Sequence, residues 1–395
     1  MVSVEDALRL VLENVISPKT ESVDFQVSLG RILAEDLVAD RDFPPFDRVT
    51  MDGIAINFAT FNEGLKTFKI QEMQAAGDEQ KTLQSPKNCI EIMTGAVLPK
   101  NTDTIIRYED LEIENGFATI LAEIKQKQNV HFQGQDKLSG QVLVGKGKVI
   151  NASHVAIAAS IGKQNLSVRA LPKIAIASSG DELVGVAEIP LSHQIRLSNV
   201  YAIVAILKKF NAAVDIFHIN DTLKDSVLKI EEMLKNYDVL IFSGGVSMGK
   251  KDFIPQALSK NSVKEIFHKI AQKPGKPMWF GKNDSTIVFA LPGNPVSTYL
   301  CTIKYVLPWL KNHLGVLEEK NSSVKLTEDI NFKPKLNYFL QVKIQNDKGC
   351  FYATPLKHHG SGDFISLAEA DGFIELPYRE SGLFLKGENV DFFAI

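Results

Sequence analysis

The segment VLIFSGGVSMG, residues 239–249, decides how the centre of this chain folds. Residues 239–243 are apolar or small, and the run has the length of a strand that is buried on both faces. Two adjacent glycines, Gly244 and Gly245, end the strand and begin a loop. From Lys173 to about Gly315, similar runs alternate with helical patterns. Because parallel strands need crossover connections, this alternation predicts a mainly parallel α/β sheet.

Apolar spacing on either side of this segment predicts further elements. In the α/β part we expect strands at 174–178, 213–219 and 287–291, with helices at 200–210 and 223–234. Elsewhere we expect helices at 4–15, 29–37 and 153–161, and short strands at 53–58, 89–93, 104–108, 339–344, 351–355 and 372–376. The middle of the chain is therefore β-rich, and the end is a β-barrel or sandwich. Helix 153–161 is too small to form a core alone and is expected to pack on the N-terminal helices, which makes the β-rich part an insertion.

The composition is that of an ordinary globular protein. Of 395 residues, 45% are hydrophobic and 23% charged, and the net charge is -3, so no strong nucleic-acid-binding field is expected. The start has no secretory signal pattern, and no apolar stretch is long enough to span a membrane. The 3 cysteines, Cys89, Cys301 and Cys350, are far apart and not in metal-ligand pairs. They are interpreted as small hydrophobic residues in a reducing cytoplasm.

Carboxylates follow several of the predicted strands. Ligands of open parallel sheets bind beyond the carboxyl ends of the strands, where Glu182, Asp221 and Asp252 are all expected. Each alone is better explained as a cap or turn residue, but together they lie beside Gly244 and Gly245, whose amides can bind a phosphate. Carboxylates facing a phosphate require a cation between them, and oxygen ligands indicate Mg²⁺. A P-loop NTPase is excluded because Lys251 stands where such proteins need Ser or Thr.

Two more loops can bind anions. Asn294 is a candidate N-cap and Pro295 the first residue of a helix to about Leu307, so its amides form an anion site. A plain helix start explains the same residues equally well. The turn PGKP, residues 274–277, lies between two strands and is expected to expose the positively charged side chain of Lys276.

Six motifs in series carry a resemblance to a known family. They are MDG (51–53), MTGA (93–96), SGDEL (179–183), SGGVS (243–247), PGKP (274–277) and LPGNPVS (291–297). With these in order over nearly its whole length, the chain resembles the MoeA-type molybdopterin molybdenumtransferases, of which the gephyrin E domain is a relative.

The resemblance implies four domains, with a MogA-like α/β domain at the centre. Their bounds are 1–42 with 141–172 for a discontinuous linker and dimerisation domain, 43–140 for the β-rich insertion, 173–317 for the α/β domain and 318–395 for a C-terminal β-barrel. It also implies an elongated homodimer, a MogA-like adenylyltransferase and acceptor molybdoenzymes as partners, and neither nucleic acid nor membrane.

The implied reaction converts molybdopterin adenylate and molybdate into molybdenum cofactor, AMP and water, with Mg²⁺. The implied site is shared between subunits, with Asp52, Thr94 and Asp136 coming across the dimer. The catalytic candidates are Glu182, Asp221, Asp252, Asp52, Asp136 and Thr94, of which Glu182, Asp221 and Asp252 would hold the metal. Binding candidates are Gly180, Asp181, Ser243, Gly244, Gly245, Ser247, Lys273, Pro274, Gly275, Lys276, Pro292, Gly293, Asn294, Pro295 and Ser297. Lys273, Lys276 and the helix start at Asn294 are the candidates for molybdate.

Some positions depart from the family pattern. Segment 129–136 lacks the usual arginines and glutamate but keeps Asp136, Leu197 precedes Ser198-Asn199, and Asp371 replaces an asparagine. We interpret this as a modified molybdate or pterin pocket with activity retained. The alternatives are a non-catalytic pterin-binding or scaffold homologue, and an enzyme for another nucleotide, such as the pyridine-nucleotide amidohydrolases. The motifs outside the α/β part argue against the last.

Overall fold

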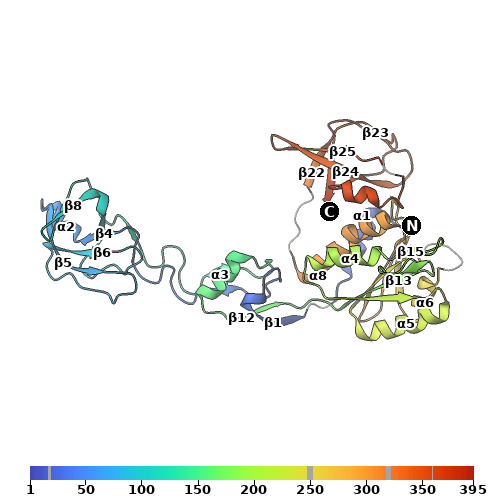
Figure 1. Cartoon of the computed structure of the whole chain (residues 1–395), viewed down its shortest axis with the longest axis horizontal. Helices are drawn as coiled ribbons and strands as arrows, with labels where there is room; N and C mark the ends of the chain where they lie inside the picture. The colour runs from blue at the N-terminus through green and yellow to red at the C-terminus, as the bar shows by residue number, and fades with distance from the viewer. Residues whose placement is uncertain (17–18, 247–251, 317–321, 358) are drawn as a thin grey trace. The chain divides into compact units, whose positions relative to one another are not determined.

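The computed structural model describes residues 1–16, 19–246, 252–316, 322–357 and 359–395. The chain forms two compact units (Figure 1). Unit 1 comprises residues 1–34, 147–151 and 165–395, and unit 2 comprises 35–146 and 152–164. Unit 2 therefore interrupts unit 1 in the sequence. Strand β1 (Thr20–Asp24), which precedes unit 2 in the sequence, pairs antiparallel with β12 (Asn165–Arg169), which follows it. The finer division into four domains stays a prediction.

A six-stranded sheet with the order β16-β13-β17-β21-β20-β18 forms the centre of unit 1. Its strands are β13 (Ile174–Ser179), β16 (Val214–Ile219), β17 (Val239–Ser243), β18 (Lys264–His268), β20 (Trp279–Lys282) and β21 (Ile287–Leu291). Strands β16, β13, β17 and β21 are parallel, and β20 is antiparallel to both of its neighbours. The predicted mainly parallel sheet is therefore confirmed. Ser178 pairs with Ser243, and Ser243 with Leu291, so the carboxyl ends of these strands lie level.

Alternating residues of the central strands enter different cores. Ile241 and Phe289 belong to one hydrophobic cluster, whereas their neighbours Phe242 and Val288 belong to another. This follows from the two-residue period of a strand that is covered on both faces. Helices on the first side are α1 (Val4–Glu13), α4 (Asn199–Lys208), α7 (Pro295–Cys301) and α8 (Leu307–Leu314), with the π-helix η3 (Thr302–Val306) between α7 and α8. Helices on the second side are α5 (Leu223–Asn236) and α6 (Ile254–Lys260).

The N-terminal helix α1 forms as predicted. Ser3 caps it by accepting a 3.0 Å hydrogen bond from the Asp6 amide, and Val4, Ala7 and Val11 are buried. The helix packs on α8, where the Trp309 Nε1–H donates to the carbonyl oxygen of Asn14 at 2.7 Å. The segment expected at 153–161 forms α3 (Ala152–Ser160) within unit 2, and its packing on the N-terminal helix stays a prediction.

Residues 29–37 do not form the predicted helix. Gly30 has a φ of +78°, and Ile32 and Leu33 form isolated bridges with Val149 and Val168. Ile32, Leu33 and Leu37 are buried from an extended backbone instead, because strand partners from later in the chain take up the hydrogen bonds, and Leu29 is exposed.

A closed β-barrel ends the chain, as predicted. Strands β24, β25, β22, β28 and β26 pair in this order, and an added β24–β26 pairing closes the ring. The bounds are β22 (Ser322–Leu326), β23 (Ile330–Asn331), β24 (Asn337–Asp347), β25 (Cys350–Pro355), α9 (Ile365–Glu369), β26 (Gly372–Leu376), β27 (Leu383–Phe384) and β28 (Asn389–Ala394). The short strand β19 (Gln272–Lys273) of the α/β part pairs in parallel with β24.

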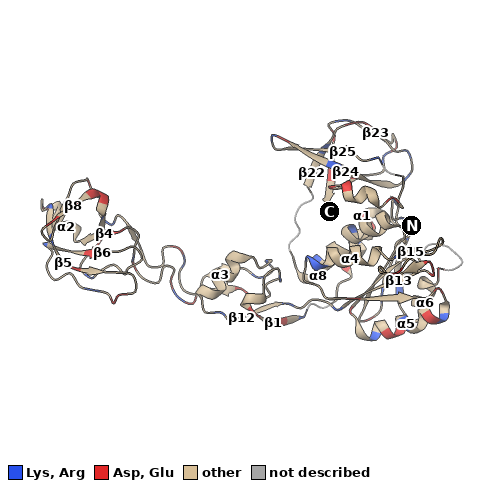
Figure 2. Cartoon of the chain, in the orientation of Figure 1, with Lys and Arg blue, Asp and Glu red and all other residues tan. Residues whose placement is uncertain are grey.

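Unit 2 is built on a sheet with the order β7-β4-β6-β5-β9-β8. Its elements are β2 (Leu37–Val38), β3 (Arg48–Val49), β4 (Gly53–Ile56), α2 (Phe58–Asn62), β5 (Thr67–Gln74), β6 (Asn88–Ile92), β7 (Thr104–Arg107), β8 (Leu111–Glu114), β9 (Phe117–Ile120), β10 (Val130–His131), β11 (Val142–Val144) and α3. Acidic and basic residues are interspersed in both units (Figure 2), in keeping with the net charge of -3. Within the described ranges, no helix combines the length and the apolar character needed to cross a bilayer.

Candidate active site

A cavity of about 860 Å³ opens at the carboxyl ends of the parallel strands, within unit 1. The loops that follow β13, β16, β17 and β21 line it, together with segment 272–277 and residues from the C-terminal barrel. These loops meet because the strands end level in the sheet. The polar residues that the sequence places after each strand therefore share one space.

The glycine loop, residues 243–246, lies against the end of β13. Gly244 has a φ of +97° and Gly245 a φ of +68°, which favour glycine. A β-carbon on Gly244 would lie 2.9 Å from the carbonyl oxygen of Ser179, and one on Gly245 would lie 2.5 Å from its Oγ. Ser179 Oγ is buried and has no hydrogen-bond partner among the described residues. A buried polar atom without a partner is costly, so this one fits a ligand that can hydrogen bond at the glycine loop.

The three predicted metal-binding carboxylates, Glu182, Asp221 and Asp252, all line the cavity. Glu182 folds back, so that a β-carbon on Gly180 would lie 2.6 Å from Glu182 Oε2. Asp221 binds the neighbouring loop: its Oδ2 accepts from the Asp181 amide at 3.4 Å, and its own amide donates to Asp181 Oδ1 at 3.2 Å. In the part of the chain that the structure describes, no three His, Cys, Asp or Glu residues are close enough to hold a metal ion. The carboxylates thus share a cavity without forming a compact ligand set.

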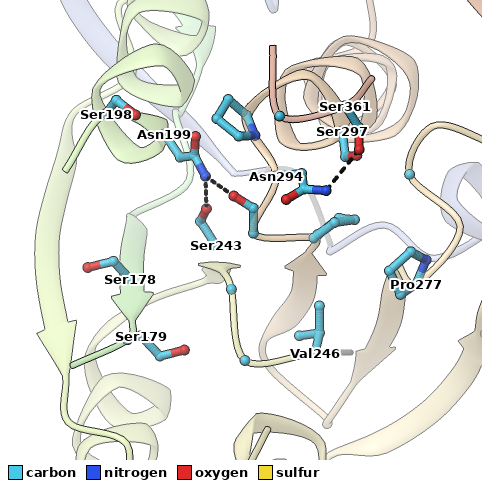
Figure 3. A pocket seen from close by; sticks show the side chains of 18 of the residues that line it. Ser178, Ser179, Ser198, Asn199, Ser243, Val246, Pro277, Asn294, Ser297 and Ser361 are labelled. Atoms are coloured by element: carbon cyan, nitrogen blue, oxygen red, sulfur yellow. Dashed lines mark hydrogen bonds between the residues drawn. The ribbon is translucent and has the colours of Figure 1, made fainter. Parts of the chain in front are cut away.

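Asn199, at the start of α4, connects three parts of the cavity wall. Its Nδ2 donates to Ser243 Oγ at 3.0 Å and to the carbonyl oxygen of Gly293 at 2.7 Å (Figure 3). The same atom donates to Thr298 Oγ1 at 3.3 Å. The residue fixes the end of β17 against the loop after β21. Sequence reasoning noted Ser198-Asn199 but did not count Asn199 as a site residue.

Asn294 occupies the N-cap position of α7, but its side chain makes no capping hydrogen bond. Its Nδ2 donates instead to Ser361 Oγ of the C-terminal barrel at 2.8 Å (Figure 3). The Val296 amide donates to the Ser361 carbonyl oxygen at 3.2 Å. The predicted N-cap position of Asn294 and the helix start at Pro295 are thus confirmed. A loop of the barrel binds the Asn294 side-chain amide and one N-terminal amide of the helix.

The lysine loop, residues 273–277, carries two exposed lysines on the cavity wall. The Lys273–Pro274 peptide bond is cis, and Gly275 has a φ of +89°. Lys273 Nζ lies 6.0 Å from the ring centroids of both Phe332 and Tyr338, which stack on each other. Lys276 has no such aromatic contact among the described residues.

The catalytic candidates outside the α/β part all lie in unit 2. Asp52 Oδ1 accepts a 2.6 Å hydrogen bond from the Thr94 amide, and this bond holds the pKa of Asp52 below its ordinary value. Asp136 Oδ1 lies 2.9 Å from His131 Nε2. The structure therefore pairs Asp52 with Thr94. That these residues and Asp136 reach the cavity of a second subunit stays a prediction.

Three regions of the sequence match family models. These are the MoeA N-terminal region (domain I and II) over residues 2–162, the probable molybdopterin binding domain over 175–312 and the MoeA C-terminal region (domain IV) over 323–395. A molybdopterin molybdenumtransferase of Synechocystis is 36% identical over 100% of both chains. The chain belongs to the MoeA family.

Further relatives agree with this assignment. A molybdopterin molybdenumtransferase of Staphylococcus epidermidis is 29% identical over 99% of this chain and 94% of its own length. The crystal structure of a MoeA protein of molybdopterin biosynthesis from Pyrococcus horikoshii matches with a TM-score of 0.85 at 30% identity, covering 100% of this chain and 99% of that one. This member of the MoeA family therefore has the family's fold over its whole length.

Most predicted site residues of this MoeA-family chain are in one place. Those that line the cavity are Gly180, Glu182, Asp221, Ser243, Gly244, Gly245, Asp252, Lys273, Pro274, Gly275, Lys276, Pro292, Gly293, Asn294, Pro295 and Ser297. Asp181 contacts Asp221 from the neighbouring loop, and Ser247 lies outside the described residues. Lining residues that were not among the predicted site residues include Ser179, Arg196, Asn199, Gln272, Leu336, Ser361 and Gly362. Leu336, Ser361 and Gly362 belong to the barrel, for which the sequence predicts no site residue.

Proposed function

We propose that this chain transfers molybdate to adenylated molybdopterin, forming molybdenum cofactor and releasing AMP. The observation that carries the proposal is the cavity of unit 1, where the glycine loop, three carboxylates and two lysines line one space. A substrate with a phosphoanhydride and a second, tetrahedral anion needs such a combination of backbone donors, acidic residues and cations.

The glycine loop is suited to the phosphates of the adenylate. With no side chains on Gly244 and Gly245, an anion can approach the backbone closely. Ser179 Oγ, which lacks a partner among the described residues, can donate to a phosphate oxygen. These groups are fixed before the substrate binds, so they would stabilise the charge that develops on the departing AMP.

The carboxylates support a magnesium ion by their chemistry. Glu182, Asp221 and Asp252 offer the oxygen donors that Mg²⁺ prefers, next to a site for phosphate. When bound, the ion would neutralise charge on the phosphoanhydride. Holding it requires the Glu182 side chain, now folded over Gly180, to turn toward the other two carboxylates.

Molybdate binding falls to the lysine loop in this proposal. Lys273 and Lys276 provide positive charge, and the sulfur atoms that receive the metal belong to the pterin. We further propose a homodimer in which Asp52, Thr94 and Asp136 of one subunit complete the cavity of the other. The adenylate must come from an adenylyltransferase of the MogA type, and the product passes to molybdoenzymes. The proposed location is the cytoplasm, in keeping with the free thiols of Cys89, Cys301 and Cys350.

The test is AMP release from molybdopterin adenylate with Mg²⁺ and molybdate, comparing the wild type with Glu182→Gln and Asp252→Asn. We expect each variant to lose activity by about 10²-fold, since each removes a charge that acts on the reacting phosphates. The melting temperature should change little, because neither side chain is part of a hydrophobic core.

Glu231→Gln is the matched control, because Glu231 only pairs with Lys235 at 2.7 Å on the surface of α5. Its activity should equal that of the wild type. Unaltered turnover in both test variants would remove the carboxylates from the mechanism. If the wild type binds the adenylate without releasing AMP, the chain is a pterin-binding homologue rather than an enzyme.

A further inference from the structure

Behind the lysine loop lies a buried hydrogen-bonding network that the proposed reaction does not itself require. Gln272, at the base of the loop, is 0% exposed, as are Tyr305 and Cys301. The Tyr305 hydroxyl donates to Gln272 Oε1. Gln272 Nε2 donates to the carbonyl oxygen of Pro274 at 2.9 Å and to Cys301 Sγ at 3.8 Å. Every polar atom of the glutamine side chain thus has a partner.

The network turns the carbonyl groups of the lysine loop toward the protein interior. The Pro274 oxygen accepts from Gln272, and the Gly275 oxygen accepts from the Cys301 thiol at 3.8 Å. The Lys276 oxygen accepts from the Ile270 amide at 2.9 Å. Three successive carbonyl oxygens, which would repel an anion, are therefore held by donors at the back of the loop.

The front of the loop keeps its donors. Within the described residues, the amides of Gly275 and Lys276 donate no hydrogen bond to the protein. The loop lines the cavity, so these amides and the Lys276 ammonium group are available to a ligand there. A pair of backbone amides beside a cation is a suitable site for a tetrahedral oxyanion.

The donors of the network stay protonated over the working pH range. Burial raises the pKa of the Cys301 thiol, and burial also raises the pKa of the Tyr305 hydroxyl well above its usual range. Tyr305 reaches the glutamine from the π-helix η3, in which neighbouring Lys304 forms a 2.7 Å ion pair with Glu375 of the barrel. π-Helical turns of this kind are frequent at functional sites.

We propose that Gln272, oriented by Tyr305 and Cys301, is a positioning residue that sets the lysine loop for binding the tetrahedral oxyanion substrate. The glutamine lies behind the loop and fixes which side of the loop faces the cavity. This inference rests on the proposed function for the identity of the oxyanion, which is molybdate.

Titration of the full chain with molybdate in a calorimeter tests the inference without turnover. Gln272→Met keeps the volume and removes all three hydrogen bonds, and Tyr305→Phe removes only the hydroxyl. Loss of the Gln272 bonds should weaken molybdate binding by about two- to tenfold in Gln272→Met, and loss of the Tyr305 bond that orients Gln272 should weaken it less in Tyr305→Phe. The double variant should bind no more weakly than Gln272→Met alone, because both changes act through one side chain.

Gln341→Met is the matched control. Gln341 is also buried, at 2% exposed, and accepts from Ser366 Oγ at 3.0 Å, but it does not line the cavity. Its substitution should leave the dissociation constant for molybdate unchanged. In turnover assays Gln272→Met should raise the KM for molybdate and leave kcat and the KM for the adenylate within about twofold.

Equal dissociation constants for the wild type and Gln272→Met would overturn the inference and leave the proposed function intact. Equal weakening in Gln341→Met would also overturn it, because the effect would then reflect loss of stability alone. A wild type that binds no molybdate would also overturn the inference about Gln272. A wild type that binds molybdate but releases no AMP would remove the proposed function, and the dissociation constants of the variants would still decide the role of Gln272.

Discussion

The glycine loop and the lysine loop line the same cavity but are held in different ways. The glycine loop owes its conformation to its own residues, because Gly244 and Gly245 have positive φ values and lie directly on Ser179. The lysine loop owes its conformation to Gln272 beneath it and to Cys301, which comes from α7. One loop is thus set by its own glycines and the other by the side chains behind it, and three pairs of variants test this difference.

The largest effect is expected for Gly245→Ala. The new β-carbon would lie 2.5 Å from Ser179 Oγ and 2.7 Å from Ile254 Cγ1, so the Ser179 side chain and the buried Ile254 side chain must both move. Gly387→Ala is the control, because Gly387 also has a positive φ, +83°, but nothing lies within 4 Å of its β-carbon position. Urea denaturation should show that Gly245→Ala lowers the free energy of unfolding by about 2–3 kcal/mol more than the control. Equal losses would mean that the glycine loop is not tightly packed.

A smaller loss of stability is expected for Gly275→Ala, with a specific functional loss. The added carbon would meet Gln272 Nε2 at 2.6 Å and Cys301 Sγ at 2.7 Å. These are the ends of side chains, which can shift, so the loss should exceed that of Gly349→Ala by only about 1 kcal/mol. Gly349 has a nearly equal φ, +88°, with open space around it. The KM for molybdate should rise in Gly275→Ala and not in Gly349→Ala. An unchanged KM in Gly275→Ala would contradict the role given to Gln272 and Cys301.

The smallest effect is expected for the two lysines of the lysine loop, as a difference in the KM for molybdate between their variants. Lys273 Nζ lies 6.0 Å from the stacked rings of Phe332 and Tyr338, whereas Lys276 has no such contact among the described residues. We therefore expect Lys276→Met to raise the KM for molybdate about tenfold, because it removes a charged hydrogen-bond donor to the anion. Lys273→Met should raise it about twofold, because Lys273 acts on the anion only through its charge. Kinetics at low and high salt measure this. The reverse order would show that Lys273 leaves the aromatic pair to bind the anion.

The parts of the fold with a strong local signal could be predicted from the sequence. Strands 239–243 and 287–291 were predicted with the observed bounds, because both are buried apolar runs ended by Gly or Pro. The helix expected at 29–37 was wrong, because its apolar residues at helical spacing bind strand partners more than a hundred residues later in the chain. Local spacing holds no information about such partners.

The same distinction applies to the site. Glycines and carboxylates placed directly after strands predicted most of the cavity wall. Asn199 could not be recognised, since its partners Ser243 and Gly293 are 44 and 94 residues away. Asn294 occupies the predicted N-cap position, but its bond to Ser361 of the barrel, 67 residues away, could not be recognised either. Side chains that act through distant partners are missed when only neighbours are considered.

The pairing of β19 with β24 limits how this protein can be divided or recombined. The strand that leads into the lysine loop borders the barrel, and the Asn337 amide donates to the Ala271 carbonyl oxygen at 2.9 Å. Phe339 and Phe373 of the barrel are buried in the same core as the α/β sheet. A chimera that joins the α/β part to a foreign C-terminus would uncover this apolar surface and leave the loop without its bordering strand. The α/β part and the barrel are therefore expected to be exchangeable between homologues only when they are moved together.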